Sequence, residues 1–275
     1  KVSEKNADGY KSFWKEYGAV LKEGLYEDAE RKEALLDLCR FSTNENDDPI
    51  SLSEYVEKMP EKQKDIYYIS AETKDQALAS PHLEGFKSKK IPVLIMTDAI
   101  DQFWLPMVGS FKEKKFTSIT QGQINLDDLD EKNKDKKKDD KNEKEKKDKE
   151  YVDLVAQLKV VLGDQVKDIR LSSKLTDSPV CLVADEGDMD IAMEQLMAQR
   201  DTNYKGAPRI LEINGDHSLI KNMKSLLSKK ENNDLVSDAG TLLFEQARLM
   251  EGKMPADPAQ FSKIMNQFLL KAIPN

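Results

Sequence analysis

Residues 65–98, "DIYYISAETKDQALASPHLEGFKSKKIPVLIMTD", decide the fold of the first part of the chain. "DIYYIS" and "IPVLIMTD" are short, apolar and rich in β-branched or aromatic residues, as buried strands are. The segment between them favours a helix until Pro81 interrupts it. A strand, a helix and a second strand in this order predict a parallel crossover with the helices outside the sheet.

Helical periodicity dominates the residues before this crossover. The segments 10–25 and 28–42 both predict helices, and in the first of them Phe13, Tyr17, Val20 and Leu21 share one face. A shorter helix is expected over 51–59, with Ser51 or Ser53 as its N-cap.

A run of charges over residues 127–150, "DDLDEKNKDKKKDDKNEKEKKDKE", has almost no apolar side chain to bury and therefore predicts a boundary. Up to about Asp139 the residues four apart mostly carry like charges, whereas from Asp140 onward they carry opposite charges. We expect a flexible first half, then a solvated helix that continues into residues 151–163. A spacer is a better interpretation than an interaction tail.

After this run the pattern again mixes strands and helices. Strands are expected over 166–172, 178–185 and 209–215, and two amphipathic helices over 234–252 and 257–273 close the chain. The predicted fold class is mixed, α+β with α/β. A small α-β-α unit fills residues 1–126, residues 127–150 form the charged linker, and an α+β domain fills residues 151–275.

The composition excludes several functions. The formal net charge of −8 argues against binding nucleic acid, which requires clustered positive charge. The sequence has no apolar run long enough to span a membrane and no signal-peptide pattern. Cys39 and Cys181, with His82 and His217, give no known zinc spacing. Two unpaired cysteines suit a reducing compartment.

No catalytic group stands out either. The sequence contains no GxGxxG after a strand and no phosphate-binding loop of the GxxxxGK[ST] type. In "GDHS", residues 215–218, consecutive side chains diverge, so a catalytic triad is not expected, and Asp216 is expected to cap a helix. His82 is expected to be structural. We predict no catalytic residue and no metal site.

The last two predicted helices carry long apolar faces. Two such helices at a chain end make half of a four-helix bundle, which a second copy of the chain would complete. The alternative is that both helices pack back on their own sheet, and the pattern leaves the two possibilities open. The apolar residues concerned are Leu235, Val236, Ala239, Leu242, Leu243 and Leu249 in the first helix and Phe261, Ile264, Met265, Phe268, Leu269 and Ala272 in the second.

A methionine stripe and an aromatic pair raise the same question of burial or exposure. Met189, Met193, Leu196 and Met197 share one face of an acidic helical segment. Burying one such side chain yields about 1.5–3 kcal/mol, which favours core, but methionine also suits surfaces that accept many shapes. Phe103 and Trp104 are expected in the core by default, whereas exposure would mark a contact site.

Several longer strings make the chain similar to a known family. They are "FWKEYGAVLKEGLYED", "RKEALLDLCRFSTN", "IYYISAETKDQALASPHLEGFKSKKIPVLIMTDAIDQFW", "VKDIRLSSKLTDSPVCLVAD", "LEINGDH" and "ADPAQFSKIMNQ". In this order they resemble the heat-shock protein 90 chaperone family, in its bacterial type, over nearly the whole chain outside the linker. The resemblance implies a dimeric, ATP-driven chaperone.

The resemblance also divides the functions among domains. It implies that residues 1–126 are the distal part of the middle domain and residues 151–275 the C-terminal dimerisation domain. The ATPase domain, with its ATP and magnesium, would belong to the full-length protein. We therefore expect neither enzyme activity nor a cofactor in this fragment.

Site residues follow from the same resemblance. The helices over 234–251 and 258–273 would form the four-helix bundle of a homodimer. Client-binding residues would be Phe103, with Trp104 beside it, and Met189, Met193, Leu196 and Met197, which favours an exposed stripe. The expected partners are a second copy and unfolded or partly folded proteins, in the bacterial cytoplasm. The alternative is an assembly module whose methionine stripe is ordinary core.

Three features depart from the family pattern. Gly215 and Ser218 stand where family members usually have prolines, which should loosen that turn without abolishing the fold. The linker is more highly charged than usual. The end "KAIPN" lacks the acidic tail of eukaryotic cytosolic members.

Overall fold

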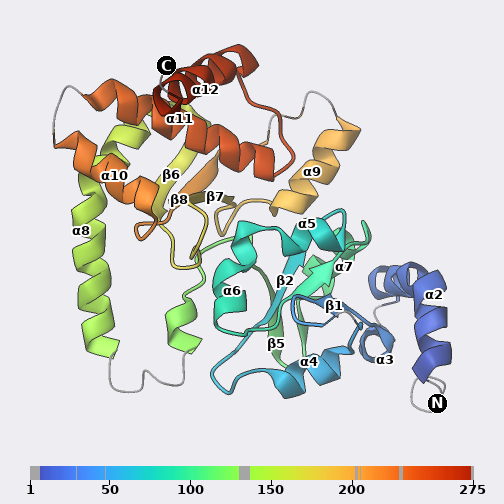
Figure 1. The fold of residues 1–275 in the computed structure, drawn as a ribbon. Coiled ribbons are helices and arrows are strands. Elements are labelled where there is room, and N and C mark those ends of the chain that lie inside the picture. Colours follow the sequence, from blue (N-terminus) through green and yellow to red (C-terminus); the bar gives the residue numbers. More distant parts are fainter. Residues whose placement is uncertain are drawn as a thin grey trace. The chain divides into compact units, whose positions relative to one another are not determined.

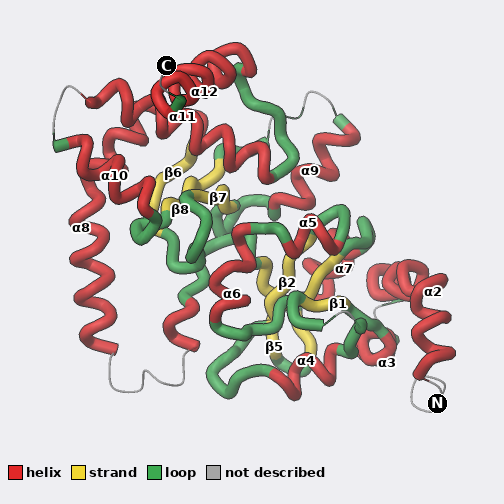
Figure 2. Tube along the Cα trace, viewed as in Figure 1, coloured by secondary structure: helices red, strands yellow, loops and turns green. Residues whose placement is uncertain are grey.

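A computed structural model describes residues 7–28, 30–46, 48–129, 137–201, 204, 206–228 and 232–273. It divides into two compact units. The first comprises Lys1–Glu131 and Met189–Gly206, and the second comprises Lys132–Asp188 and Ala207–Asn275. Each unit combines a sheet with helices, which confirms the predicted mixture of α and β structure (Figures 1 and 2).

The first unit is built on a five-stranded sheet with the order β1-β3-β2-β5-β4. Its strands are β1 (Ser42–Thr43), β2 (Ile66–Ser70), β3 (Leu94–Met96), β4 (Ser110–Phe111) and β5 (Lys114–Ser118). β2 and β3 pair in parallel, as the crossover prediction requires. The connection between them is helical in pieces: α5 (Lys74–Leu78), the 3-10 turn η1 (Pro81–Leu83) and α6 (Glu84–Ser88).

Alternation along the two central strands produces two cores, one on each face of this sheet. Ile66 of β2 and Leu94 and Met96 of β3 pack on one face. Tyr67 and Ile69 of β2, with Ile95 of β3, pack on the other, against α5 and α6. Successive side chains of a strand point to opposite faces, so a continuous apolar run fills both cores.

Four helices contribute to the first of these cores. They are α2 (Ala7–Glu27), α3 (Lys32–Leu38), α4 (Leu52–Lys58) and α7 (Asp101–Val108). The sequence did not predict α7. The apolar face predicted for α2 is not the face that the helix buries. Phe13, Tyr17 and Val20 are exposed, whereas Tyr10 and Leu25 are buried.

The second unit has a three-stranded sheet with the order β6-β8-β7, in which β6 and β8 are parallel and β8 and β7 antiparallel. Its strands are β6 (Val166–Leu171), β7 (Val180–Val183) and β8 (Arg209–Ile213), close to the predicted ranges. Its helices are α8 (Lys137–Leu162), α10 (Ser218–Leu227), α11 (Asn233–Met250) and α12 (Pro258–Ala272).

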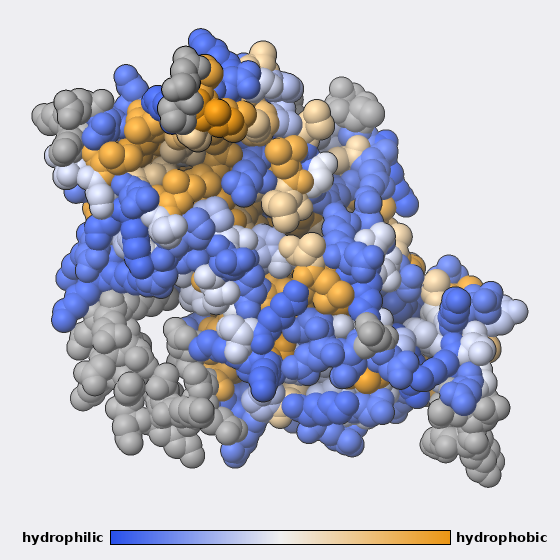
Figure 3. Space-filling view, viewed as in Figure 1, coloured by the Kyte–Doolittle hydropathy of each residue, from blue (hydrophilic) through white to orange (hydrophobic). Residues whose placement is uncertain are grey.

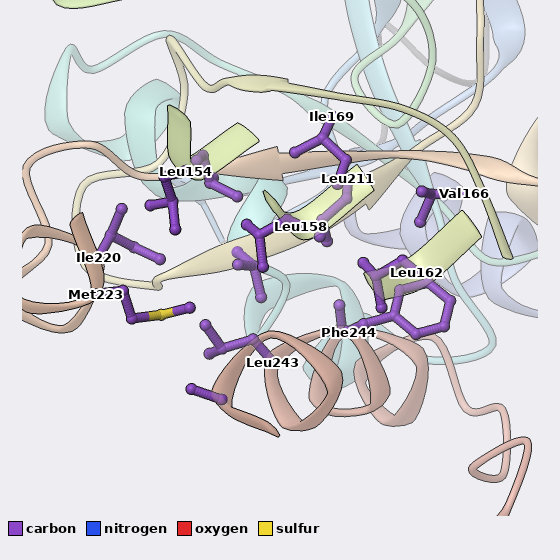
Figure 4. Packing of buried hydrophobic residues seen from close by; sticks show 14 of the residues in the cluster. Leu154, Leu158, Leu162, Val166, Ile169, Leu211, Ile220, Met223, Leu243 and Phe244 are labelled. Atoms are coloured by element: carbon purple, nitrogen blue, oxygen red, sulfur yellow. The ribbon is translucent and has the colours of Figure 1, made fainter. Parts of the chain in front are cut away.

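One face of this sheet carries the core of the second unit. Leu154, Leu158 and Leu162 of α8 meet Leu243 and Phe244 of α11 there (Figure 4). α11 approaches α8 closely at Gly240, where a Cβ atom would overlap the Leu158 side chain. The opposite face is partly polar, because Arg170 of β6 donates to the buried Glu212 of β8 at 2.8 and 3.0 Å. A sheet covered by helices on one face fits the predicted α+β architecture.

The charged linker becomes a helix three residues earlier than predicted. α8 begins at Lys137, against the predicted Asp140, and runs through Tyr151 to Leu162 as expected. Leu126–Leu129 form a 3-10 turn. The rest of the predicted flexible first half, residues 130–136, lies outside the described residues.

A different residue from the predicted one caps α10. His217, not Asp216, is the N-cap, and its Nδ1 accepts a hydrogen bond from the Leu219 N–H at 3.2 Å. Asp216 instead forms an ion pair with Lys147. Ser218 is the first helical residue, a position that accepts proline readily, so the family's proline there would be compatible with this backbone.

We expect Ser51→Ala to lower the free energy of unfolding of the first unit by about 1 kcal/mol. The Ser51 hydroxyl accepts from the Glu54 N–H at 3.2 Å, and the Glu54 carboxylate accepts from the Ser51 N–H at 2.7 Å, so Ser51 is the cap of α4. Ser53→Ala is the matched control, because Ser53 only accepts an exposed bond from Lys112. Both tryptophans lie in this unit, so their fluorescence during urea unfolding reports it alone.

The effect should depend on pH in one direction. The hydrogen bonds from Ser51 lower the pKa of Glu54 below its ordinary value of 4.5. The bonds to the Glu54 carboxylate therefore contribute fully above that value and are lost as the pH falls through the lowered pKa, whereas the bond from the Glu54 N–H to the Ser51 hydroxyl remains. A difference between Ser51→Ala and the unsubstituted chain that persists undiminished in strong acid would contradict this role for Glu54.

Candidate functional site

The methionine-bearing helix α9 (Ile191–Arg200) has Asp190 as its N-cap, and the Asp190 carboxylate accepts two hydrogen bonds. One carboxylate oxygen of Asp190 caps the helix by accepting from the Ala192 N–H at 2.9 Å. The other accepts from the Thr120 hydroxyl at 3.0 Å, and Thr120 in turn shares a 2.8 Å hydrogen bond with Ser118 at the end of β5. The start of α9 is thereby attached to the sheet of the first unit.

The buried side of α9 is defined by Ile191 and Glu194, which are one turn apart. Glu194 packs against Gly206, where an added Cβ atom would lie 2.8 Å from the Glu194 Cδ. Gly206 also has a φ of +68°, which favours glycine. The positive φ therefore favours glycine at 206, and a larger residue there would also have to displace the Glu194 carboxyl group.

The residues of the methionine stripe differ in their exposure to solvent. Met189 precedes the helix, because α9 starts at Ile191, and it is 40% exposed, while Met197 is 38% exposed. Met193 and Leu196 are half-buried. The predicted helical stripe of four residues is thus a three-residue face on α9 with Met189 just before it.

Trp104 is not available as a contact residue. It is 0% exposed and belongs to the core, its Nε1–H donates to Asp101 Oδ1 at 2.7 Å, and its ring meets Phe116 edge-on at 5.5 Å. Asp101, Trp104, Leu105 and Val108 follow helical spacing along α7 and form its buried face. The expectation that Trp104 contacts a client is therefore corrected.

Phe103 lies on a different side of α7 from Trp104. It is half-buried, and Tyr26 of α2 meets its ring edge-on, with 6.4 Å between the ring centroids. One turn further along α7, Met107 is exposed. Phe103 therefore keeps part of its ring accessible beside two other exposed side chains.

A buried ammonium group fixes α2 against α7. Lys22 Nζ lies 2.8 Å from Asp98 Oδ2, and 2.9 and 3.0 Å from the two carboxylate oxygens of Asp101. Burial alone would lower the pKa of Lys22, but the carboxylates of Asp101 and Asp98 outweigh it and raise that pKa. Burial raises the pKa of Asp101. Three donors nevertheless surround its carboxylate, including the Trp104 indole and the Asp98 N–H, which favours its ionised form.

The C-terminal helices divide the predicted dimerisation residues into two groups. Ala239, Leu243 and Ile264 are buried within the chain's own core or against it, so these three do not belong to a free surface. Leu235, Leu242, Phe261 and Phe268 are half-buried, and Met265 and Leu269 are exposed.

The sequence prediction missed the most exposed apolar residues of this end of the chain. Leu270 is 76% exposed and lies outside the i, i+3, i+4 series predicted for this helix, and Ile273, which is 72% exposed, follows the last helical residue, Ala272. The double leucine at 269–270 was the signal that more than one face of α12 is apolar. Apolar side chains gather over α11 and α12 on the visible face (Figure 3).

The described residues contain no group of three or more histidine, cysteine, aspartate or glutamate side chains placed to hold a metal ion. Within the same part of the chain, no helix combines the length and apolarity needed to cross a membrane. Cys39 and Cys181 are buried thiols that form no disulfide, and burial raises the pKa of Cys39 to about 12.

Partly exposed apolar side chains thus lie on α7, α9 and α12, within two units that each combine a sheet with helices. Comparison with known proteins gives the particular family: the profile of the Hsp90 protein family matches residues 1–274, and the chain belongs to this family.

Individual relatives agree with this assignment. The chain is 41% identical over 275 residues to the chaperone protein HtpG of Roseobacter denitrificans, covering 99% of this chain and 44% of that protein. It is 40% identical over 274 residues to the chaperone protein HtpG of Paramagnetospirillum magneticum, with 99% and 44% covered. The chain thus spans less than half the length of these relatives.

We expect Lys22→Met to destabilise the first unit by about 3–5 kcal/mol, because it leaves the Asp101 carboxylate buried without a counter-charge. The double variant Lys22→Met/Asp101→Asn keeps an acceptor for the Trp104 indole and should lose less than the single variant. Urea unfolding followed by tryptophan fluorescence measures both. A double variant at least as unstable as Lys22→Met would show that the ion pair is not what holds α2 to α7.

Proposed function

We propose that this chain is the part of an Hsp90-type chaperone that pairs two copies through α11 and α12 and offers client-binding surface on α7 and α9. The observation that carries the proposal is the apolar surface left uncovered on these helices, in a chain of the Hsp90 family. The resemblance implies that ATP and magnesium are used by a full-length member. We assign neither ligand to a residue of this chain, and we place the protein in the bacterial cytoplasm.

Pairing of two copies is supported by the geometry of α12. α12 contacts α11, and Ile264 is its buried residue, while Met265 and Leu269 are exposed one turn apart and the exposed Ile273 follows at the C-cap. Burying an aliphatic side chain completely yields about 1.5–3 kcal/mol, and roughly half of that remains to be gained where about half of it is exposed. In a two-fold symmetric dimer each of these side chains is buried once in each copy, so the free energy gained on burial doubles. The total then lies in the range of the free-energy cost of association, about 4–15 kcal/mol.

Client binding is supported by the chemistry of the second surface. Met193, Leu196 and Met197 give a flexible apolar strip, and thioether side chains adapt to partners of different shape. Met197 is exposed, while Met193 and Leu196 are half-buried, so the strip is accessible at its C-terminal end. An adaptable apolar strip favours apolar segments of unfolded chains.

A pure assembly module is the second candidate. The half-burial of Met193 and Leu196 favours it, since ordinary core residues at the rim of a unit are buried to this extent. The exposed Met197 and the accessible part of Phe103 favour the chaperone instead. Binding to unfolded protein separates the two candidates.

We expect the chain to be dimeric at micromolar concentration and Leu269→Ser/Ile273→Ser to weaken the dimer by about 100-fold or more. Sedimentation velocity over a dilution series measures the dissociation constant. Val152→Ser/Val160→Ser is the matched control, because it removes two exposed valines from α8 and should leave the dimer unchanged. A monomer at every concentration, or a double variant that still pairs, would contradict the four-helix bundle.

We expect Met193→Ser/Met197→Ser to weaken binding of a reduced, carboxymethylated model protein by about tenfold while the dimer persists. Met197→Ser alone, at an exposed position, separates lost contact from altered packing of α9. Fluorescence anisotropy of the labelled unfolded protein gives the affinity, with the valine variant again as control. Affinity that does not change in either methionine variant would favour the assembly module.

A further inference from the structure

Tyr26 and Met107, the neighbours of Phe103, are not among the client-binding residues expected from the sequence. Tyr26 at the end of α2 is 49% exposed, and Met107 on α7 is 57% exposed. Met107 follows Phe103 by four residues, so both side chains lie on one side of α7. Tyr26 meets the Phe103 ring edge-on, with an angle of 79° between the ring planes. The three side chains form one apolar patch contributed by two helices.

The patch is held in place from beneath. Lys22 lies one turn before Tyr26 on α2, and its ammonium group is bound to Asp101 at the start of α7. This ion pair is buried and therefore fixes the separation of the two helices at the point where Tyr26 reaches Phe103. A rigid pair of aromatic rings loses little conformational entropy when a partner binds.

The charge around the patch is negative. Glu23 and Glu27 are exposed on α2, one turn before Tyr26 and next to it, and the last turn of α2 contains no basic residue. The carboxyl end of a helix itself carries partial negative charge. The nearby Arg31 lies 3.7 Å from Asp28 and pairs with that carboxylate.

We propose that Tyr26, Phe103 and Met107 form a single contact surface for an extended polypeptide segment in which apolar side chains alternate with lysine or arginine. The proposal rests on the proposed client-binding function and extends it by naming two residues and the chemistry of the bound segment. Aromatic and methionine side chains anchor the apolar groups, and Glu23 and Glu27 attract the basic ones.

The size of the patch selects a segment and not a folded partner. A stable interface between folded proteins buries about 800 Å² on each partner, contributed by about 20–30 residues a side. Three partly exposed side chains provide far less than that, but they suffice for a few residues of an extended chain.

Two synthetic peptides with the same apolar residues test the proposal, one with lysines between them and one with glutamates. Each is labelled and titrated with the full chain by fluorescence anisotropy. We expect the lysine peptide to bind more tightly, and Tyr26→Ser/Met107→Ser to weaken it by about tenfold. Both positions are exposed, so this variant should unfold in urea as the unsubstituted chain does. Val152→Ser/Val160→Ser controls for the loss of two exposed apolar side chains.

A second variant tests the charge. Glu27→Lys keeps all three apolar side chains, and we expect it to lose most of the preference for the lysine peptide. Equal binding of the lysine peptide by Tyr26→Ser/Met107→Ser and the unsubstituted chain would overturn the proposal, and so would equal binding of the two peptides by the unsubstituted chain. Either result would remove α7 from the client surface but leave pairing through α11 and α12 and binding by α9, which the dilution series and the Met193 and Met197 variants test separately.

Discussion

The ammonium group of Lys22, buried between Asp98 and Asp101, is the interaction on which the presentation of the first unit's surface depends. It joins the long N-terminal helix α2 to the short helix α7, and Asp101 also accepts from the Trp104 indole. Removing one partner of such a pair lowers the free energy of unfolding by more than the pair itself contributes, because the other charge remains buried without a partner. The buried ion pair beneath the surface therefore supports the position of Phe103 relative to Tyr26, together with the edge-on contact of the two rings.

A second constraint acts on the C-terminal helices. α11 contributes Val236, Leu243 and Phe244 to the core of its own unit, so only its remaining surface and the outer side of α12 are free for a partner. The two possibilities that the sequence left open, packing on the sheet or pairing between copies, concern different faces of the same helices. The inner residues serve the first purpose, and the outer ones are free for the second.

Sequence patterns predicted the elements whose structure follows from a local pattern of apolar residues or of charges. β2 and β3 were predictable because their continuous apolar runs fill two cores, and α8 because its opposite charges are four residues apart. The helix α7 was not predictable, since Pro106 breaks its pattern and its place depends on Lys22, 79 residues before Asp101. The residues themselves placed Trp104 in the core by default, as the structure has it, and it was the family resemblance that wrongly moved Trp104 to a contact surface. His217 replaced Asp216 as a cap because the Asp216 carboxylate pairs with Lys147.

Oxidation of individual methionines by peroxide, followed by peptide mass spectrometry at several protein concentrations, tests the central claim most directly. Exposed thioethers react and buried ones do not. The account predicts that Met107 and Met197 react at every concentration, that the buried Met96 and Met223 stay protected, and that Met265 is protected only where the chain is dimeric. Equal reactivity of Met265 at all concentrations, or protection of Met107 and Met197 in the free dimer, would contradict a dimer that leaves its client surfaces open.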